Sequence, residues 1–306
     1  MRFISRLLFT TCLSTVPLLW LTACTSTDPR LPVAAGVNPQ GLAASNFSLD
    51  CDTSVTVALQ RKVEAIDEQL RTRYGMTTQQ TAVGVLDLKG SRLAMLHPDR
   101  IEYAASVPKI GILLAWFDSH TEAVQNLDPP TRHEFGLMIK SSSNEMASKF
   151  SRQLGLRQIQ AVLDRYQLYD RNHGGGIWVG KHYGQSDERI RDPVGNHSHG
   201  ATVRQLLRFY LLLEQGKLVS PQASKLMKEI FESPEIPHDD IKFVKGLRGR
   251  EVRILRKWGS WQTWLHDTAM ITGPGRHYIL VALTNHPKGD DYLVDLAKAF
   301  DDLMTE

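Results

Sequence analysis

Apolar residues recur along this chain of 306 residues at the two spacings that distinguish helices from strands. Valines, leucines and isoleucines three or four positions apart predict a helix over about residues 55–74. Residues 81–88 are largely apolar and predict a strand. A turn at Lys89-Gly90 then leads into a partner strand over 91–96. The chain therefore opens as a helix followed by a β-hairpin.

A second helix is expected to begin at Ser106, because the residues after Lys109 are apolar on nearly every side, as in a buried helix. Serine is a good N-cap, and Pro108 is tolerated in the first turn. Lys109 then lies one turn from Ser106, where desolvation favours its neutral form. A serine beside a base is the general signature of nucleophilic catalysis. Because Ser-x-x-Lys arises by chance about once in such a chain, the buried helix is what makes it informative.

Strand signals nearly vanish between residues 119 and 204. Helices are expected there over about 135–139, 145–154 and 156–166. Residues 173–199 are rich in glycine and predict a long loop anchored by Trp178 and Tyr183. Loops of that length are usually functional or disordered.

The last third of the chain returns to strands. Helices over 202–215 and 220–231 precede β-like runs over 250–257, 266–272 and 277–284, and an amphipathic helix over 292–304 closes the chain. This order predicts a mixed α/β (α+β) fold, with an antiparallel sheet from both chain ends, flanking helices and an all-helical insertion. We expect an α/β part formed by residues 53–118 and 205–306, and a helical part formed by 119–204.

Composition and charge exclude only a few classes of function. Hydrophobic residues make up 42% and charged residues 23%, as in ordinary soluble proteins. The net charge of +3 favours no particular partner, and the absence of a basic stripe with interleaved aromatics argues against nucleic acid. Cysteines and histidines show no metal-ligand spacing, so we expect no metal and no other cofactor. We expect a monomer.

The N-terminus has the pattern of a targeting segment. Arginines precede an apolar run over residues 7–21 that polar residues interrupt, and it is too short for a confident membrane span. The run ends in Leu-Thr-Ala-Cys at Cys24, which resembles the lipobox of bacterial lipoproteins. That resemblance implies a signal peptide over 1–23, a lipid on Cys24, and an exported protein anchored in the bacterial cell envelope that faces the periplasm. The alternative is an ordinary secretory signal with a coincidental cysteine.

Residues 24–52 predict a tether that holds the domain off a membrane surface. They are rich in Pro, Gly, Ala, Ser and Asn and show no periodicity. Because Cys12 leaves with the signal peptide and Cys24 would carry lipid, Cys51 is the remaining cysteine of the exported domain. The domain would therefore be exported without a disulfide.

Three short motifs follow one another along the chain: Ser106-Val107-Pro108-Lys109, Ser142-Ser143-Asn144 and Lys257-Trp258-Gly259. They resemble the Ser-x-x-Lys, Ser-Asp-Asn and Lys-Thr-Gly motifs, in this order, of the class A serine β-lactamases and the related penicillin-interacting serine hydrolases. The resemblance extends from about residue 55 to the end of the chain and implies the β-lactamase-like fold.

The resemblance also implies a role for each matching residue. Ser106 would be the nucleophile and Lys109 its proton acceptor, or the group that orients one. Ser142 would pass a proton to the leaving nitrogen, and Asn144 would hydrogen-bond the side-chain amide of the substrate. Lys257 would keep the field positive around a substrate carboxylate.

Two further features follow from the third motif. The N–H groups of Ser106 and Ser260 would form the oxyanion hole, next to Gly259. Trp258 stands where the family has a small hydroxyl residue, so a donor to the substrate carboxylate is lost and bulk is added.

The glutamate that activates the deacylating water is not found. The segment where it should fall is Gly-Gly-Ile-Trp-Val-Gly over residues 175–180. The nearest candidates for the missing base are Asp170, His173, His182, Asp187 and Glu188. Without such a base, acylation proceeds while deacylation stalls, so an acyl-enzyme would accumulate.

Several of these residues also have a purely structural interpretation. Ser142 belongs to a run of serines that would cap a helix well. Lys257 in a strand fits a solvated edge lysine. His199 and His266 are more often structural histidines than catalysts.

The three motifs together favour a serine hydrolase. It would act on β-lactams or related peptidoglycan-derived amides through an acyl-enzyme at Ser106. The missing glutamate favours a first alternative, a D-alanyl peptidase or penicillin-binding protein with slow deacylation. Trp258 favours a second, a non-catalytic binding lipoprotein of the envelope.

Overall fold

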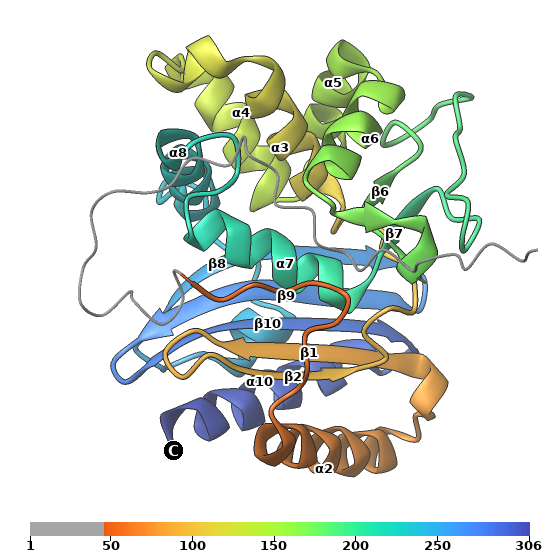
Figure 1. Cartoon of the computed structure of the whole chain (residues 1–306), viewed down its shortest axis with the longest axis vertical. Helices are drawn as coiled ribbons and strands as arrows, with labels where there is room; N and C mark the ends of the chain where they lie inside the picture. The colour runs from red at the N-terminus through yellow and green to blue at the C-terminus, as the bar shows by residue number, and fades with distance from the viewer. Residues whose placement is uncertain (1–45) are drawn as a thin grey trace, which may run out of the picture. The chain divides into compact units, whose positions relative to one another are not determined.

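The computed structural model describes residues 46–306. A five-stranded antiparallel sheet in the order β2-β1-β10-β9-β8 forms its centre (Figure 1). The strands are β1 (Thr81–Asp87), β2 (Arg92–Leu96), β8 (Arg253–Trp261), β9 (Trp264–Gly273) and β10 (Arg276–Asn285). Because β1 pairs with β10, segments from both parts of the chain meet inside one sheet, as the sequence predicts.

Helices cover both faces of this sheet (Figure 1). One face carries α2 (Val57–Tyr74) and α10 (Gly289–Thr305), and the other carries α7 (Val203–Glu214) and α8 (Pro221–Glu232). Alternate residues of β1 divide between the two cores: Val83 and Val85 pack with α2 and α10, whereas Ala82 and Leu86 pack with α7. Burial on both faces explains why β1 is apolar without alternation.

A second group of helices surrounds α3 (Lys109–Ser119). These are α4 (Pro129–Ile139), α5 (Asn144–Leu154) and α6 (Leu156–Arg165). Residues of α3 from Lys109 to Phe117 are buried, as its all-round apolar sequence predicts. The expected boundary at 118 assigns this helix to the α/β part, whereas α3 packs at the centre of the inserted helices.

The N-terminus of α3 differs from the prediction. The sequence favours Ser106 as its N-cap, but α3 begins at Lys109 and Ser106 lies in the preceding turn. Ala105 takes the left-handed conformation with φ 48°, so the chain turns sharply just before Ser106. Pro108 has helical backbone, with φ −64°, and directly precedes the first residue of α3.

The inserted region is not entirely helical, which corrects the prediction for residues 119–204. Short strands β3 (Glu102–Tyr103), β6 (Trp178–Val179) and β7 (His199–Ala201) form one sheet, and β4 (Tyr169–Asp170) pairs with β5 (Gly175–Gly176). Strands of two or three residues are too short to carry a period of two. Trp178 and Tyr183 are buried, as expected of anchors for the predicted loop.

Two features near the C-terminal strands are absent from the sequence-based prediction. The short helix α9 (Lys242–Gly246) lies before β8. Strand β8 continues to Trp261, beyond the predicted end at 257, so the whole third motif and Ser260 lie in the strand. The reversal occurs instead at Gln262, which has φ 53°.

The described chain begins inside the predicted tether. Leu49 is completely buried, and its carbonyl accepts a hydrogen bond from Arg208 of α7. The carbonyl of Phe47 accepts one from Gln215, which caps the same helix. Residues 46–52 therefore pack along α7 (Figure 1), whereas the predicted signal peptide and Cys24 lie outside the described residues. No helix within residues 46–306 has the length and apolar character needed to cross a membrane.

Gly84 of β1 lies under α7 without space for a side chain. A Cβ at this position would lie 2.4 Å from Val203 Cγ1 and 2.8 Å from Leu207 Cδ1. We expect Gly84→Val to lower the free energy of unfolding by about 1–3 kcal/mol, because α7 must move away from the sheet. Urea unfolding followed by tryptophan fluorescence measures the loss. Val57→Ala, at an exposed valine, serves as the control and should change stability by less than about 0.5 kcal/mol. Equal stability of Gly84→Val and the wild type would contradict the packing.

Candidate active site

Ser142 lies where the three motifs meet. Lys109 Nζ donates to the Ser142 carbonyl at 2.5 Å and lies 3.3 Å from its Oγ. Lys257 Nζ donates to the same Oγ at 2.9 Å. The two lysines are 33 and 115 positions from Ser142 in the sequence. Folding therefore brings α3, the turn before α5, and β8 together at one hydroxyl.

The backbone of Ser142 is unusual. Its φ of 57° lies in the left-handed region, which costs about 1–3 kcal/mol for such a residue and is concentrated at functional sites. The serine run does cap α5, but through Ser143, whose Oγ accepts the N–H of Met146. The capping interpretation of Ser142 is therefore wrong, because its hydroxyl meets the lysines instead.

Lys109 is completely buried. Besides Ser142, its Nζ bonds Asn144 Oδ1 at 2.8 Å, at the start of α5. Burial lowers the pKa of Lys109 to about 7, so a large share of this side chain is a neutral amine near neutral pH. A neutral amine can accept a proton, as the predicted role of Lys109 requires.

Lys257 is also completely buried, which contradicts the interpretation as a solvated edge lysine. Desolvation, followed by the charges of Lys109 and Arg256, lowers the pKa of Lys257 well below its ordinary value. Its Nζ donates to the carbonyl of Trp258 at 2.7 Å as well as to Ser142. Within residues 46–306, neither Lys109 nor Lys257 forms an ion pair with a carboxylate.

Gly259 allows strand β8 to lie directly against the turn of Ser106. A Cβ on Gly259 would lie 2.9 Å from the backbone nitrogen of Ser106 and 2.7 Å from the carbonyl oxygen of Ala104. In the described part of the chain, the N–H of Ser106 has no hydrogen-bond acceptor. A backbone donor left open beside a close strand is the arrangement that an oxyanion hole requires.

The hydroxyl of Ser106 is not yet paired with Lys109. Ser106 is half-buried, and its Oγ forms no hydrogen bond among residues 46–306. The amine of Lys109 is engaged with Ser142 and Asn144 instead. Catalytic hydrogen bonds are often long or absent before a substrate binds, so this geometry is compatible with the predicted roles.

Lys242 is a site residue that the sequence analysis misses. It is completely buried in α9, and its Nζ donates to the carbonyl of Gly259 at 2.9 Å and to Ser260 Oγ at 2.6 Å. Burial lowers the pKa of Lys242 to about 8. The ammonium groups of Lys242 and Lys257 each lie 5.1 Å from the centre of a Trp258 ring, within cation–π range. Trp258 thus contacts two lysines instead of providing a hydroxyl.

A buried ion pair places α9 against the end of β8. Arg256 and Asp267 are both completely inaccessible and bond at 2.8 Å. Arg256 also donates to the carbonyl of Ile241, and Asp267 accepts the N–H of Phe243. These bonds hold the residues on either side of Lys242 to β8 and β9.

None of the five candidate bases contacts the motif residues by a hydrogen bond. Asp170 bonds His173 at 2.6 Å. His182 lies between Ser151 Oγ, at 2.9 Å, and Glu188, at 3.0 Å. Asp170 and His173 are thus paired with each other, and His182 is paired with Glu188 and α5.

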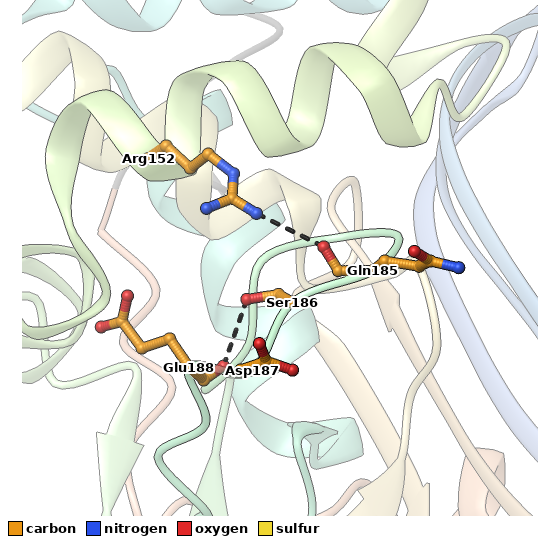
Figure 2. Close-up of a pocket in the computed structure, with 5 residues that line it drawn as sticks. All are labelled: Arg152, Gln185, Ser186, Asp187 and Glu188. Atoms are coloured by element: carbon orange, nitrogen blue, oxygen red, sulfur yellow. Dashed lines mark hydrogen bonds between the residues drawn. The ribbon is translucent and has the colours of Figure 1, made fainter.

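The other candidate carboxylates, those of Asp187 and Glu188, line a pocket that lies outside the motifs. Figure 2 shows its lining, formed by Arg152, Gln185, Ser186, Asp187 and Glu188. Arg152 donates to the Gln185 carbonyl there, at 3.4 Å. Since no motif residue lines this pocket, its carboxylates do not identify a deacylating base.

Steric constraints exclude any side chain at two positions of the 175–180 segment. A Cβ on Gly176 would lie 2.2 Å from the Leu168 carbonyl oxygen, and one on Gly180 would lie 1.8 Å from that of Ile190. The chain contributes Tyr183 instead, whose ring centre is 4.5 Å from Lys109 Nζ.

His199 and His266 are structural, as predicted. His266 Nε2 lies 2.8 Å from the Tyr103 carbonyl oxygen, and its Nδ1 accepts the N–H of Thr284. His199 Nε2 lies 3.0 Å from the carbonyl oxygen of Lys181. Burial lowers the pKa of His199 to about 4 and that of His266 to about 3, so both are neutral near pH 7. In the part of the chain that the structure describes, no three His, Cys, Asp or Glu residues are grouped to hold a metal ion.

A family model confirms the resemblance. The model of the β-lactamase enzyme family matches residues 125–300, more than half of the chain. The chain therefore belongs to this family. The matched part contains the second and third motifs and begins after Ser106 and Lys109. No curated protein sequence matches the chain.

Solved structures share the fold at low sequence identity. A β-lactamase from Sphaerobacter thermophilus has a TM-score of 0.61 at 16% identity, over 80% of this chain and 97% of that chain. A class A β-lactamase from Mycobacterium abscessus has a TM-score of 0.61 at 14% identity, over 80% and 100%. A mutant of PBP-A, solved as an acyl-enzyme complex with penicillin G, has a TM-score of 0.60 at 16% identity, over 80% and 96%. These similarities confirm the predicted fold class.

Removing one partner of the Arg256–Asp267 pair should leave an uncompensated buried charge. We expect Asp267→Ala to lower the free energy of unfolding by about 3–5 kcal/mol. Thermal and urea unfolding of the purified protein measure this loss. The double variant Arg256→Met/Asp267→Ala should recover much of it, because neither charge is then left alone. A loss below about 1 kcal/mol in Asp267→Ala would show that the pair does not hold α9.

Proposed function

We propose that this protein is a serine hydrolase that forms an acyl-enzyme through Ser106 with β-lactams or related amides of the bacterial cell wall. The observation that carries the proposal is the meeting of Lys109 and Lys257 at Ser142. This hydrogen-bonded group lies in a site where Gly259 also contacts the turn of Ser106. Acyl transfer needs a nucleophile, a proton relay and an oxyanion site, and the described residues supply a candidate for each.

In acylation, Ser106 Oγ attacks the carbonyl carbon as its proton passes to the neutral amine of Lys109. The N–H groups of Ser106 and Ser260 stabilise the oxyanion that forms. When the C–N bond breaks, the proton reaches the leaving nitrogen through the Ser142 hydroxyl, which lies 3.3 Å from Lys109 Nζ. Lys257 holds this hydroxyl in place at 2.9 Å. The amine of Lys109 is then neutral again.

Asn144 and Trp258 border the substrate. The Oδ1 of Asn144 already accepts a hydrogen bond from Lys109, so its amide N–H groups remain to bind the side-chain amide of a substrate. Trp258 presents an aromatic ring where the family has a small hydroxyl residue.

An enzyme with slow deacylation, such as a penicillin-binding protein or D-alanyl peptidase, is the second candidate. The observation in its favour is that no carboxylate of residues 46–306 pairs with Lys109 or Lys257. Attack of water on the acyl-enzyme requires a general base. The related fold of PBP-A has been obtained as an acyl-enzyme with penicillin G, in a mutant, so this fold can hold the intermediate.

We also propose that the protein is an exported lipoprotein of the bacterial envelope. Its support is the Leu-Thr-Ala-Cys sequence that ends the apolar N-terminal run. The signal peptide over 1–23 is then removed, and Cys24 carries the lipid. A monomer on the periplasmic side of the membrane meets cell-wall amides without any further partner.

Substitution of Ser106 tests the acyl-enzyme directly. After brief exposure to benzylpenicillin, intact-mass spectrometry should show a mass increase equal to the whole antibiotic, because opening the ring releases no fragment. Ser106→Ala should show no increase, since the attacking oxygen is gone. Ser119→Ala, at the exposed C-terminal end of α3, is the matched control and should react like the wild type.

The time course separates the two candidates. An adduct that clears while the hydrolysed antibiotic accumulates identifies a β-lactamase. A persistent adduct identifies an enzyme with slow deacylation. If neither β-lactams nor D-alanyl peptides react at Ser106, the proposed function is wrong.

A further inference from the structure

Tyr183 contacts both parts of the acylation site although no motif includes it. Its ring centre lies 4.5 Å from Lys109 Nζ. Its hydroxyl donates at 3.1 Å to the carbonyl of Ala105, the residue before Ser106. The side chain is buried, with 7% of the residue exposed. A single tyrosine therefore contacts the proton acceptor and the turn that carries the nucleophile.

The turn that Tyr183 contacts is conformationally strained. Ala105 has φ 48°, a left-handed conformation that alanine seldom adopts. The N–H of Val107 bonds the Ala104 carbonyl at 3.0 Å and completes the turn. This conformation leaves the N–H of Ser106 open beside β8. The hydrogen bond from Tyr183 stabilises the carbonyl of the strained residue.

Tyr183 is itself held from two sides. Its ring packs on His199 of β7, with ring centres 4.4 Å apart. The adjacent His182 is 3% exposed and bridges Ser151 of α5 and Glu188, at 2.9 and 3.0 Å. The segment around Tyr183 is therefore fixed to α5 and β7.

Few titratable groups surround Lys109. Lys257 of β8, His199 of β7 and Tyr183 itself face it. Burial keeps the pKa of His199 at about 4, so this ring is uncharged near neutral pH. Desolvation lowers the pKa of Lys257 well below its ordinary value. The neutral form of Lys109 therefore depends mainly on the exclusion of water.

We propose that Tyr183 is a positioning residue for acylation. Its ring keeps water from Lys109, and its hydroxyl fixes the Ala105 carbonyl so that Ser106 stays beside Gly259. This inference rests on the proposed acyl-enzyme at Ser106 and adds to it a residue that acts through Lys109 and the turn of Ser106.

Two substitutions separate the effects of the ring and of the hydroxyl. In the wild type, the rate of acylation by benzylpenicillin should rise with pH through about 7, because Lys109 accepts a proton only when neutral. Tyr183→Leu admits water to Lys109, so we expect this rise to move to higher pH by about one unit or more. Tyr183→Phe keeps the ring, so the pH profile should stay in place. Its plateau rate should fall about three- to tenfold, the effect of one lost hydrogen bond.

A second tyrosine provides the matched control. The hydroxyl of Tyr166 bonds Asp118 and the N–H of Val219, away from the motifs. Tyr166→Phe should therefore change neither the rate nor the pH profile. Thermal unfolding of every variant reveals any loss of fold, and Tyr183→Phe tests the hydroxyl even if Tyr183→Leu is unstable.

The outcomes distinguish this inference from the proposed function. If the pH profile of Tyr183→Leu stays in place or moves to lower pH, the ring does not keep water from Lys109. If Tyr183→Phe reacts at the wild-type rate, the hydroxyl does not position the turn. Either result overturns the corresponding part of the inference while the acyl-enzyme stands. A wild type without a Ser106-dependent adduct overturns both.

Discussion

The hydrogen bonds of Ser142 unite a site whose parts come from three separate regions of the chain. Lys109 and Lys257 are completely buried and have no carboxylate ion pair within residues 46–306. A buried ammonium without a counter-charge is costly, so the proton is lost more readily. Burial destabilises the charged form of both lysines, and for the same reason it makes Lys109 suitable as a base. The chemistry of the site therefore follows from how the inserted helices and the sheet enclose it.

The sheet provides the rigid side of this enclosure. Strand β8 can approach Ser106 because position 259 has no side chain, and its pairing with β9 fixes its register. The buried Arg256–Asp267 pair then holds α9, from which Lys242 reaches the end of β8. Interactions that stabilise the fold thus also determine where the open N–H of Ser106 faces strand β8.

The sequence predicts the larger elements because their apolar periodicity is long enough to read. Helices α2, α6 and α10 and the strands of the main sheet lie close to their predicted positions. The short strands of the inserted region carry no such signal, and α9 has only five residues. The N-cap expected at Ser106 is wrong, since Ser106 lies in a turn after the left-handed Ala105 and α3 begins at Lys109, a backbone path that apolar periodicity does not reveal.

The residues of the candidate site also fall into two groups, those that the sequence predicts and those that only the structure reveals. Motif spacing identifies Ser106, Lys109 and Lys257 without any structure. Lys242 and Tyr183 carry no motif, because their importance comes from tertiary contacts with β8 and α3. In the serine run before α5, likewise, only the structure shows that Ser143 caps the helix while Ser142 bonds the lysines.

The most direct test of an acyl-enzyme at Ser106 is a crystal structure of the protein after reaction with benzylpenicillin. We expect continuous electron density from Ser106 Oγ to the opened antibiotic. The carbonyl oxygen of the adduct should lie within about 3 Å of the N–H groups of Ser106 and Ser260. Density attached to another residue, or a carbonyl oxygen directed away from both N–H groups, would show that Ser106 and this oxyanion hole do not carry the reaction.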